Sequence, residues 1–289
     1  MGHALAVDPA QAVGIVAVGV AAGALSGMLG VGGAVLTTPG IRALGATPIE
    51  AIGSTIPAIL PSAISGTVRY SRAKLVNWNI GLTCGITGSV MALAGAVVAD
   101  RVNAHALLVL TAVLLGWSGW TVYRSGRRAE AEPEPADTPE VETVHTPDAA
   151  NPGAVPTAAT DVATRTPVGG PALAAIGAGS GFVAGLLGVG GGVVMLPVFT
   201  RLLRIPVKEA VASSLVAVAI FSIPALVTHA VLGNINWAYA LLLTIGVVPG
   251  AQIGARITVG VTDKTVRTVA GLFFVGLAVV YGISEILAF

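Results

Sequence analysis

Charged residues are scarce in this chain. Only 10% of its 289 residues are Asp, Glu, Lys or Arg, whereas 54% are hydrophobic, and the mean hydropathy is +0.86. A soluble domain carries about 25% charged residues, so this class is excluded. Most of the charge-free windows reach the roughly 18–20 residues of a membrane-spanning helix. These windows are 9–41, 51–68, 75–99, 102–123, 166–200, 210–255 and 268–284. We therefore expect an all-α, multi-pass protein of the cell membrane, with the lipid bilayer as its solvent.

Cysteine is nearly absent as well, since Cys84 is the one thiol. One cysteine excludes an internal disulfide and a cysteine-based metal site. The apolar windows contain no Ser-His-Asp set, no HExxH and no pair of carboxylates, and no glycine-rich loop is followed by Lys-Ser or Lys-Thr. We therefore expect no enzyme activity, no cofactor, no metal and no ATP-binding module. The basic residues fall between the apolar windows, so nucleic acid is not an expected partner, and the sequence sets no oligomeric state.

Glycine is abundant, with 38 residues, and it clusters in two related stretches. Residues 27–39 read GMLGVGGAVLTTP and residues 185–197 read GLLGVGGGVVMLP, which match at 8 of 13 positions. Glycine inside a helix costs about 1 kcal/mol relative to alanine, so each cluster predicts a helix break. Broken backbone at membrane depth is tolerated only inside protein or beside a polar cavity. The two stretches therefore predict one site that is contributed twice.

The similarity extends along the chain as an internal repeat. At an offset of 159 residues, Glu50 matches Glu209, Ser54 matches Ser213, and Asn77-Trp78 matches Asn236-Trp237. We predict a first membrane repeat over residues 9–123 and a second over residues 169–289, each with four segments. Between them, residues 124–168 are rich in Pro, Ala, Thr and Glu, a composition typical of a disordered acidic linker.

Loop charge distinguishes two topologies, because Lys and Arg favour the cytoplasmic side. Eight full spans with parallel repeats place the basic loops of the two halves on opposite sides. If the glycine-broken first segment of each half instead enters and leaves on one face, twelve basic residues share the cytoplasmic side, and Arg42 and Arg101 lie outside. They are Arg69, Arg72, Lys74, Arg124, Arg127, Arg128, Arg201, Arg204, Lys208, Arg256, Lys264 and Arg267. We favour this arrangement of six spans and two re-entrant hairpins, which makes the halves inverted repeats.

The candidate site consists of neutral hydrogen-bond donors and not of charged side chains. A half-helix that starts after a glycine break directs free amides toward an anion, although close helix packing is the alternative explanation of such glycines. Candidate backbone ligands are Gly30, Gly32, Gly33, Gly188, Gly190, Gly191 and Gly192. Candidate side-chain ligands are Thr37, Thr38, Ser54, Thr55, Ser213, Ser214 and Gln252. The alternative for the serine and threonine hydroxyls is a hydrogen bond to a carbonyl of their own helix.

Two repeated carboxylates complete the set of candidates. Glu50 falls three residues after Thr47 and before an apolar run, which predicts a capping box. Glu209 occupies the equivalent helix start in the second half. Capping is the favoured role of both residues, and coupling to a proton or a cation is the second.

The paired glycine motifs resemble the sulfite exporter TauE/SafE family of membrane transporters. The likeness is carried by residues 23–39 and 181–197, each GxxxGxLGVGG followed by proline, with Asn77-Trp78 and Asn236-Trp237 in support. The first copy departs from the second, since it reads GVGGA rather than GVGGG. The resemblance implies transport of sulfite, sulfonates or related sulfur anions without a bound cofactor, whereas the residues alone indicate only a small anion. We expect a secondary transporter that works by alternating access; a passive anion channel and a glycine-packed structural protein are the alternatives.

Overall fold

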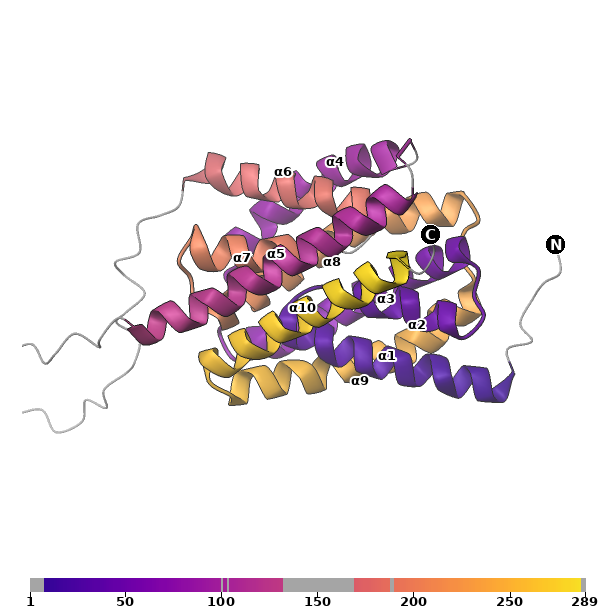
Figure 1. The fold of residues 1–289 in the computed structure, drawn as a ribbon, viewed down its shortest axis with the longest axis horizontal. Coiled ribbons are helices and arrows are strands. Elements are labelled where there is room, and N and C mark those ends of the chain that lie inside the picture. Colours follow the sequence, from indigo (N-terminus) through magenta and orange to yellow (C-terminus); the bar gives the residue numbers. More distant parts are fainter. Residues whose placement is uncertain (1–7, 100, 103, 132–168, 188–189, 287–289) are drawn as a thin grey trace, which may run out of the picture.

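The computed structural model describes residues 8–99, 101–102, 104–131, 169–187 and 190–286, and this part of the chain is all helical (Figure 1). The helices are α1 (Pro9–Leu29), α2 (Ala34–Ala43), α3 (Pro48–Arg72), α4 (Trp78–Ala99), α5 (Ala104–Ala131), α6 (Gly170–Leu187), α7 (Gly192–Arg201), α8 (Val207–Val231), α9 (Trp237–Gly260) and α10 (Asp263–Ile286). Seven of them are long and apolar enough to cross a membrane, namely α1, α3, α4, α6, α8, α9 and α10. The expectation of a multi-pass helical membrane protein is confirmed.

Glycine breaks the first segment between α1 and α2. Gly30 ends α1 in the left-handed conformation with φ of 72°, and Gly32 and Gly33 follow with φ of 87° and 81°. An L-residue with a side chain rarely adopts such angles, whereas glycine does so without a steric penalty. Three such residues within four positions explain why the helix stops here instead of continuing to Pro39.

The short helix α2 folds back along α1. The Gln11 side chain near the start of α1 donates a hydrogen bond to the Leu44 carbonyl just beyond α2. Gly40 in α2 also packs against Val18 in α1. The chain therefore leaves α2 beside the point where it entered α1, as a hairpin requires.

The two arms of each hairpin have unequal lengths. Two half-helices were expected, but α1 has 21 residues and α2 has 10, while α6 has 18 and α7 has 10. At 1.5 Å per residue the long arms measure about 27–32 Å and the short arms about 15 Å. Only the short arm is a half-helix, because the glycines come late in the uncharged run.

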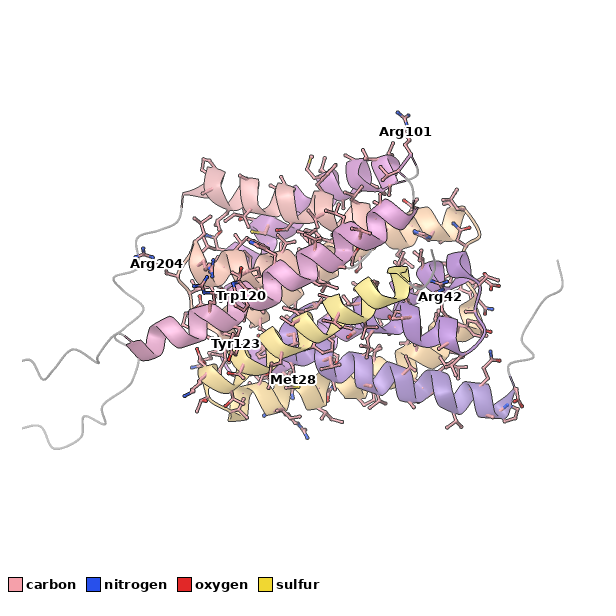
Figure 2. The ribbon with its side chains drawn as sticks, in the orientation of Figure 1. Met28, Arg42, Arg101, Trp120, Tyr123 and Arg204 are labelled. Atoms are coloured by element: carbon pink, nitrogen blue, oxygen red, sulfur yellow. The ribbon has the colours of Figure 1, made fainter. Side chains whose placement is uncertain are left out.

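The hairpins enter the bundle from opposite ends. In Figure 1, α1 begins at the right of the bundle and α6 at the left. Figure 2 shows Arg42 and Arg101 toward the right end, and Arg204, Trp120 and Tyr123 toward the left. Hydrogen bonds also join the ends of several helices: Arg201 at the end of α7 donates to the Thr121 carbonyl of α5, and Lys208 at the start of α8 donates to the Val259 carbonyl of α9 and lies 4.0 Å from Asp263.

Helix α3 extends beyond the charge-free window 51–68. It runs through Pro57 and Pro61 without interruption and includes Arg69 and Arg72, which were counted with the basic loops. The capping box is confirmed at its start, where the Thr47 hydroxyl accepts from the Glu50 amide and the Glu50 carboxylate accepts from Thr47 N. The prolines are accommodated in a helix that packs against α8 and α9 along one side, while Ile52, Ile64 and Val68 remain exposed on the other.

Glycine also sets the closest helix contacts. Gly19, Gly23 and Gly27 on one face of α1 lie against the backbone of α9, and α6 packs on α4 in the same way. A side chain at these positions would overlap the carbonyl oxygens of the partner helix. Such small-residue faces let backbones approach where lipid supplies no hydrophobic driving force.

The segment between the halves is described only in part. Helix α5 continues through residues 124–131, which were assigned to the linker. The remaining linker, residues 132–168, lies outside the described residues. Cys84 is a buried free thiol whose sulfur donates to the Leu173 carbonyl at 3.3 Å.

Candidate functional site

The two glycine breaks contact each other inside the bundle. A Cβ added to Gly192 would overlap the Gly30 carbonyl oxygen and would lie 2.8 Å from the Val31 Cα. A Cβ added to Gly190 would lie 2.6 Å from the Val31 carbonyl oxygen. Gly188 lies outside the described residues. Among the glycines that are described, the structure therefore brings the first and second breaks together through their backbones.

Hydroxyl groups satisfy the carbonyls at the end of α1. Tyr70 donates to the Gly27 carbonyl at 2.6 Å, Thr258 donates to Met28 at 3.3 Å, and Ser214 donates to Gly30 at 3.1 Å. Tyr70 and Ser214 are fully buried. A helix end leaves its last carbonyls without partners, and these three side chains, which come from α3, α8 and α9, supply donors that water cannot reach.

In the described part of the chain, the backbone amides that follow the break, unlike the carbonyls that precede it, have no hydrogen-bond partners. Within the described residues, the amides of Val31 to Val35 form no hydrogen bond, and the N-cap Gly33 has no side chain to offer. The next amides, those of Leu36 and Thr37, donate to the Gly33 carbonyl at 3.1 Å. Five consecutive donors therefore lie at the N-terminus of α2, where the helix dipole adds partial positive charge.

Two of the predicted hydroxyls lie at this break and two lie beside it. Thr37 donates to the Gly33 carbonyl at 3.2 Å, and Ser214 reaches Gly30 as described. Thr38 and Thr55 form a pair with 3.4 Å between their hydroxyl oxygens, which joins α2 to α3. Thr55 also donates to the Ile52 carbonyl of its own helix at 2.9 Å, the local alternative considered above.

The other predicted side chains lie elsewhere. Ser54 accepts a hydrogen bond from the Asn236 amide at 2.9 Å, and Ser213 accepts one from the Asn77 amide at 3.0 Å. Both serines are fully buried in contacts between α3 or α8 and the start of another helix. Gln252 is exposed on the outer face of α9, because Ala251 and Gly254 occupy the face toward α1.

Sequence reasoning missed four polar residues around the first break. Ser62 donates to Ser26 at 3.4 Å, and both are 1% exposed. Ser26 also borders the open side of Gly33, and Tyr70 and Thr258 hold the end of α1. Ser26 lies in the glycine-rich stretch of α1 and could have been found there, whereas only the fold brings the other three to the break.

The repeated carboxylates have different surroundings. Glu50 belongs to the exposed capping box of α3. Glu209 is half-buried in the first turn of α8 and accepts from the Asn77 side-chain amide at 3.1 Å. Glu209 therefore connects the two halves, and Glu50 stays within its own helix. In the described part of the chain no group of three or more His, Cys, Asp and Glu could hold a metal ion.

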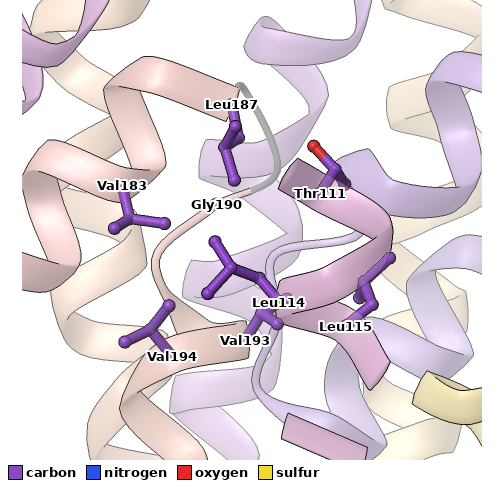
Figure 3. Close-up of a pocket in the computed structure, with 8 residues that line it drawn as sticks. All are labelled: Thr111, Leu114, Leu115, Val183, Leu187, Gly190, Val193 and Val194. Atoms are coloured by element: carbon purple, nitrogen blue, oxygen red, sulfur yellow. The ribbon is translucent and has the colours of Figure 1, made fainter. Parts of the chain in front are cut away.

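Two small cavities flank the breaks. One lies among Thr111, Leu114, Val183, Gly190 and Val193, between α5 and the second hairpin (Figure 3). The other is lined by Ser26, Val31, Gly33, Val35 and Phe273 among others, between α10 and the first hairpin. Each has about 10 Å³, which is near the minimum for one water molecule. Neither holds an anion as it stands.

Comparison with known proteins agrees with the features described above. The family model for the sulfite exporter TauE/SafE matches residues 15–281. The probable membrane transporter protein YunE of Bacillus subtilis is 27% identical over 277 residues, which cover 92% of this chain and 96% of that protein. A probable membrane transporter protein of Xylella fastidiosa is 25% identical over 257 residues, 88% of each chain. One from Methanocaldococcus jannaschii is 22% identical over 283 residues, also 88% of each. No solved structure matches the chain. The chain is therefore a multi-pass membrane transporter, not an enzyme, and belongs to the sulfite exporter TauE/SafE family.

Proposed function

We propose that this chain is a secondary transporter that moves a small sulfur-containing oxyanion, such as sulfite or a sulfonate, by alternating access. The anion binds where the two glycine breaks meet, near the middle of the bundle. The halves act as inverted repeats, and α1–α2 and α6–α7 are re-entrant hairpins between six spanning helices. The substrate class follows from the family name together with the unbonded backbone amides at the first break.

One observation carries the anion assignment, namely the unequal treatment of donors and acceptors at the first break. Tyr70, Thr258 and Ser214 donate to the carbonyls that end α1, whereas the amides of Val31 to Val35 receive no acceptor within the described residues. An unsatisfied buried backbone group in a membrane costs several kcal/mol. A cation needs acceptors, and the carbonyls of Gly27, Met28, Gly30 and Gly33 at this break are already bonded. An oxyanion needs donors, and these donors are free.

Neutral donors also suit a carrier, which has to release what it binds. Ser26 and Ser62 lie beside the break as additional hydroxyls, and their 3.4 Å separation is longer than the 2.7–2.8 Å typical of an O–H···O bond. At the repeat-related positions the second half has Ala184 and Phe221. The hydroxyls that select the anion therefore belong to the first half, while the second half contributes glycine backbone and Ser214.

Contacts between the halves support the inverted arrangement. The Ser54–Asn236 and Ser213–Asn77 hydrogen bonds join repeat-related residues in reciprocal pairs. The most extensive helix contacts, α1 with α9 and α4 with α6, are also repeat-related. Figure 1 shows the two hairpins entering from opposite ends, as a two-fold axis in the membrane plane requires.

A carrier fits the geometry better than a channel. The breaks contact each other through their backbones, and the flanking cavities admit about one water molecule each. This is the geometry of an occluded state, which alternating access requires and an open pore does not. Glu209, which spans the halves through Asn77, is the carboxylate we assign to a coupling proton, while Glu50 serves as a cap.

Ligand binding by the purified protein tests the substrate class directly. We expect sulfite and methanesulfonate to raise the melting temperature more than acetate, phosphate or chloride at equal ionic strength. A ligand at 100 times its Kd stabilises the folded state by about 2.7 kcal/mol. Stabilisation by a cation alone, or by none of these anions, would contradict the proposal.

A matched pair of double variants then tests the site. Gly32→Leu with Gly190→Leu adds one side chain at each break, against Val218 at the first and against the Val31 carbonyl at the second, and we expect it to abolish anion binding. Gly179→Leu with Gly276→Leu places the same side chains in open space and leaves binding intact. Size-exclusion chromatography establishes that the variants are folded, and Ser26→Ala with Ser62→Ala is a milder substitute if the first pair is not. Undiminished binding by the folded site variants overturns the assignment.

Flux into proteoliposomes separates carrier from channel. Uptake that saturates with external anion and follows a proton gradient supports the carrier. A large conductance that does not saturate supports the channel.

A further inference from the structure

Three contacts join the start of α4 to the first turns of α8. The amide of Asn77, just before α4, donates to the buried Ser213 hydroxyl of α8 at 3.0 Å. The Asn77 side chain donates in turn to Glu209, one turn earlier on α8, at 3.1 Å. Gly81 in the first turn of α4 packs closely on α8. A Cβ added at this glycine would lie 3.0 Å from the Ser213 carbonyl oxygen. We call these three contacts the inner latch.

The repeat-related contact joins the start of α9 to the first turns of α3. The amide of Asn236, just before α9, donates to the buried Ser54 hydroxyl of α3 at 2.9 Å. The Asn236 side chain caps its own helix by accepting from the amides of Ala238 and Tyr239 at 3.1 and 3.4 Å. Gly53 packs against the Asn234 backbone so closely that no side chain fits there. We call this set the outer latch.

We propose that the inner and outer latches are the two gates of the transporter, each of which opens when its serine releases the asparagine amide. This inference rests on the alternating access proposed above. Each latch joins one half of the chain to the other, and each contains a single hydrogen bond between the serine and an amide. Both are closed in this structure, which agrees with the absence of an anion-sized space in the two described cavities.

The two gates are not equally strong. Among the described residues, the Asn77–Glu209 hydrogen bond has no counterpart in the outer latch, because Glu50 is engaged in the capping box with Thr47. Hydrogen bonds to charged groups are stronger than bonds between neutral groups. The inner gate is therefore the harder one to open, and the protein without ligand opens more readily at the outer end.

Sided labelling of one reporter cysteine tests the gates. The reporter is Thr37→Cys, a buried position at the first break, in a Cys84→Ala background. A membrane-impermeant maleimide is added to spheroplasts, which present the outer face, or to inside-out vesicles. We expect Ser54→Ala to raise labelling about fivefold from the outside only, and Ser213→Ala to raise it about fivefold from the inside only, since each removes one hydrogen bond. Glu209→Gln raises inside labelling alone.

The control is Ser222→Ala, which removes a hydroxyl that bonds the Ala219 carbonyl of its own helix and changes labelling on neither side. Equal labelling of the Ser54 and Ser213 variants from both sides, or no change in either, would overturn the gate assignment. Hydrogen exchange of the Asn77 and Asn236 amides is a second readout: each serine variant speeds exchange at its own partner amide and leaves the other unchanged, and general acceleration contradicts the proposal. Neither measurement needs substrate, so failure here is separate from failure of the anion proposal.

Discussion

The Ser118 hydroxyl on α5 donates a hydrogen bond to the Val193 carbonyl on α7 at 2.9 Å. That carbonyl lies four residues before Pro197, which has no amide to bond it. The first hairpin repeats the arrangement with a different donor: Tyr281 on α10 bonds the Val35 carbonyl at 3.3 Å, four residues before Pro39. A hydroxyl from the last helix of one half therefore supplies the bond that proline removes from the hairpin of the other half.

This relationship predicts a thermodynamic coupling between Ser118 and Pro197. Ser118→Ala leaves a buried carbonyl without a donor, and we expect it to lower the free energy of unfolding by about 1–3 kcal/mol. In a Pro197→Ala background the helix amide bonds the same carbonyl, so the Ser118 substitution should cost less. Thermal unfolding of the four proteins in detergent gives the coupling energy. Additive effects would show that the proline and the hydroxyl act independently.

The buried Tyr70 hydroxyl should contribute more to the stability of the fold than the half-buried Tyr239 hydroxyl does. It is fully buried, and its 2.6 Å hydrogen bond satisfies the Gly27 carbonyl at the end of α1. We expect Tyr70→Phe to lower the free energy of unfolding by about 1–3 kcal/mol, because the carbonyl cannot reach water. Tyr239→Phe is the matched control, since that hydroxyl is half-buried and accepts from Gln11 at 3.2 Å. Equal losses in the two variants would contradict the argument.

The proposed topology of six spans and two re-entrant hairpins predicts which exposed arginines face the cytoplasm. In a Cys84→Ala background, we expect Arg42→Cys and Arg101→Cys to react with an impermeant maleimide from outside the cell. Arg204→Cys should react only in inside-out vesicles, since it lies at the opposite end of the bundle (Figure 2). Eight full spans with parallel repeats would instead place Arg204 and the loop after α3 on opposite sides of the membrane. Lys74 lies in that loop, so Lys74→Cys in the same assay distinguishes the two topologies.

The Ser26–Ser62 pair should set affinity for the anion and not the stability of the fold. We expect Ser26→Ala with Ser62→Ala to weaken sulfite binding about tenfold, because two donors of ordinary hydrogen-bond strength are lost. Thermal stability without ligand should change little, since their mutual bond is long at 3.4 Å. Titration calorimetry and a melting curve measure the two effects. Lower stability with unchanged affinity would make the pair structural.

Several features of this protein follow from the sequence alone, because they depend on residues close together in the chain. The uncharged runs predict membrane helices from the cost of burying charge, and α4, Trp78–Ala99, falls within the charge-free window 75–99. The clustered glycines predict the helix breaks, since Gly30, Gly32 and Gly33 adopt angles that other residues avoid. The capping box at Thr47 is likewise a local pattern of residues three apart.

Tertiary structure alone decided what the polar side chains at the breaks and between the helices do. Ser54 and Ser213 recur in both halves and were predicted as ligands, yet each accepts a hydrogen bond from an asparagine more than 130 residues away. Tyr70 has no sequence signal for its role, because the carbonyl that it satisfies lies 43 residues earlier and loses its helix partner only through the break that follows it. A hydroxyl can bond any carbonyl or amide that the fold brings within about 3 Å. Its partner is therefore set by the packing of helices that are distant in sequence, which no local pattern encodes.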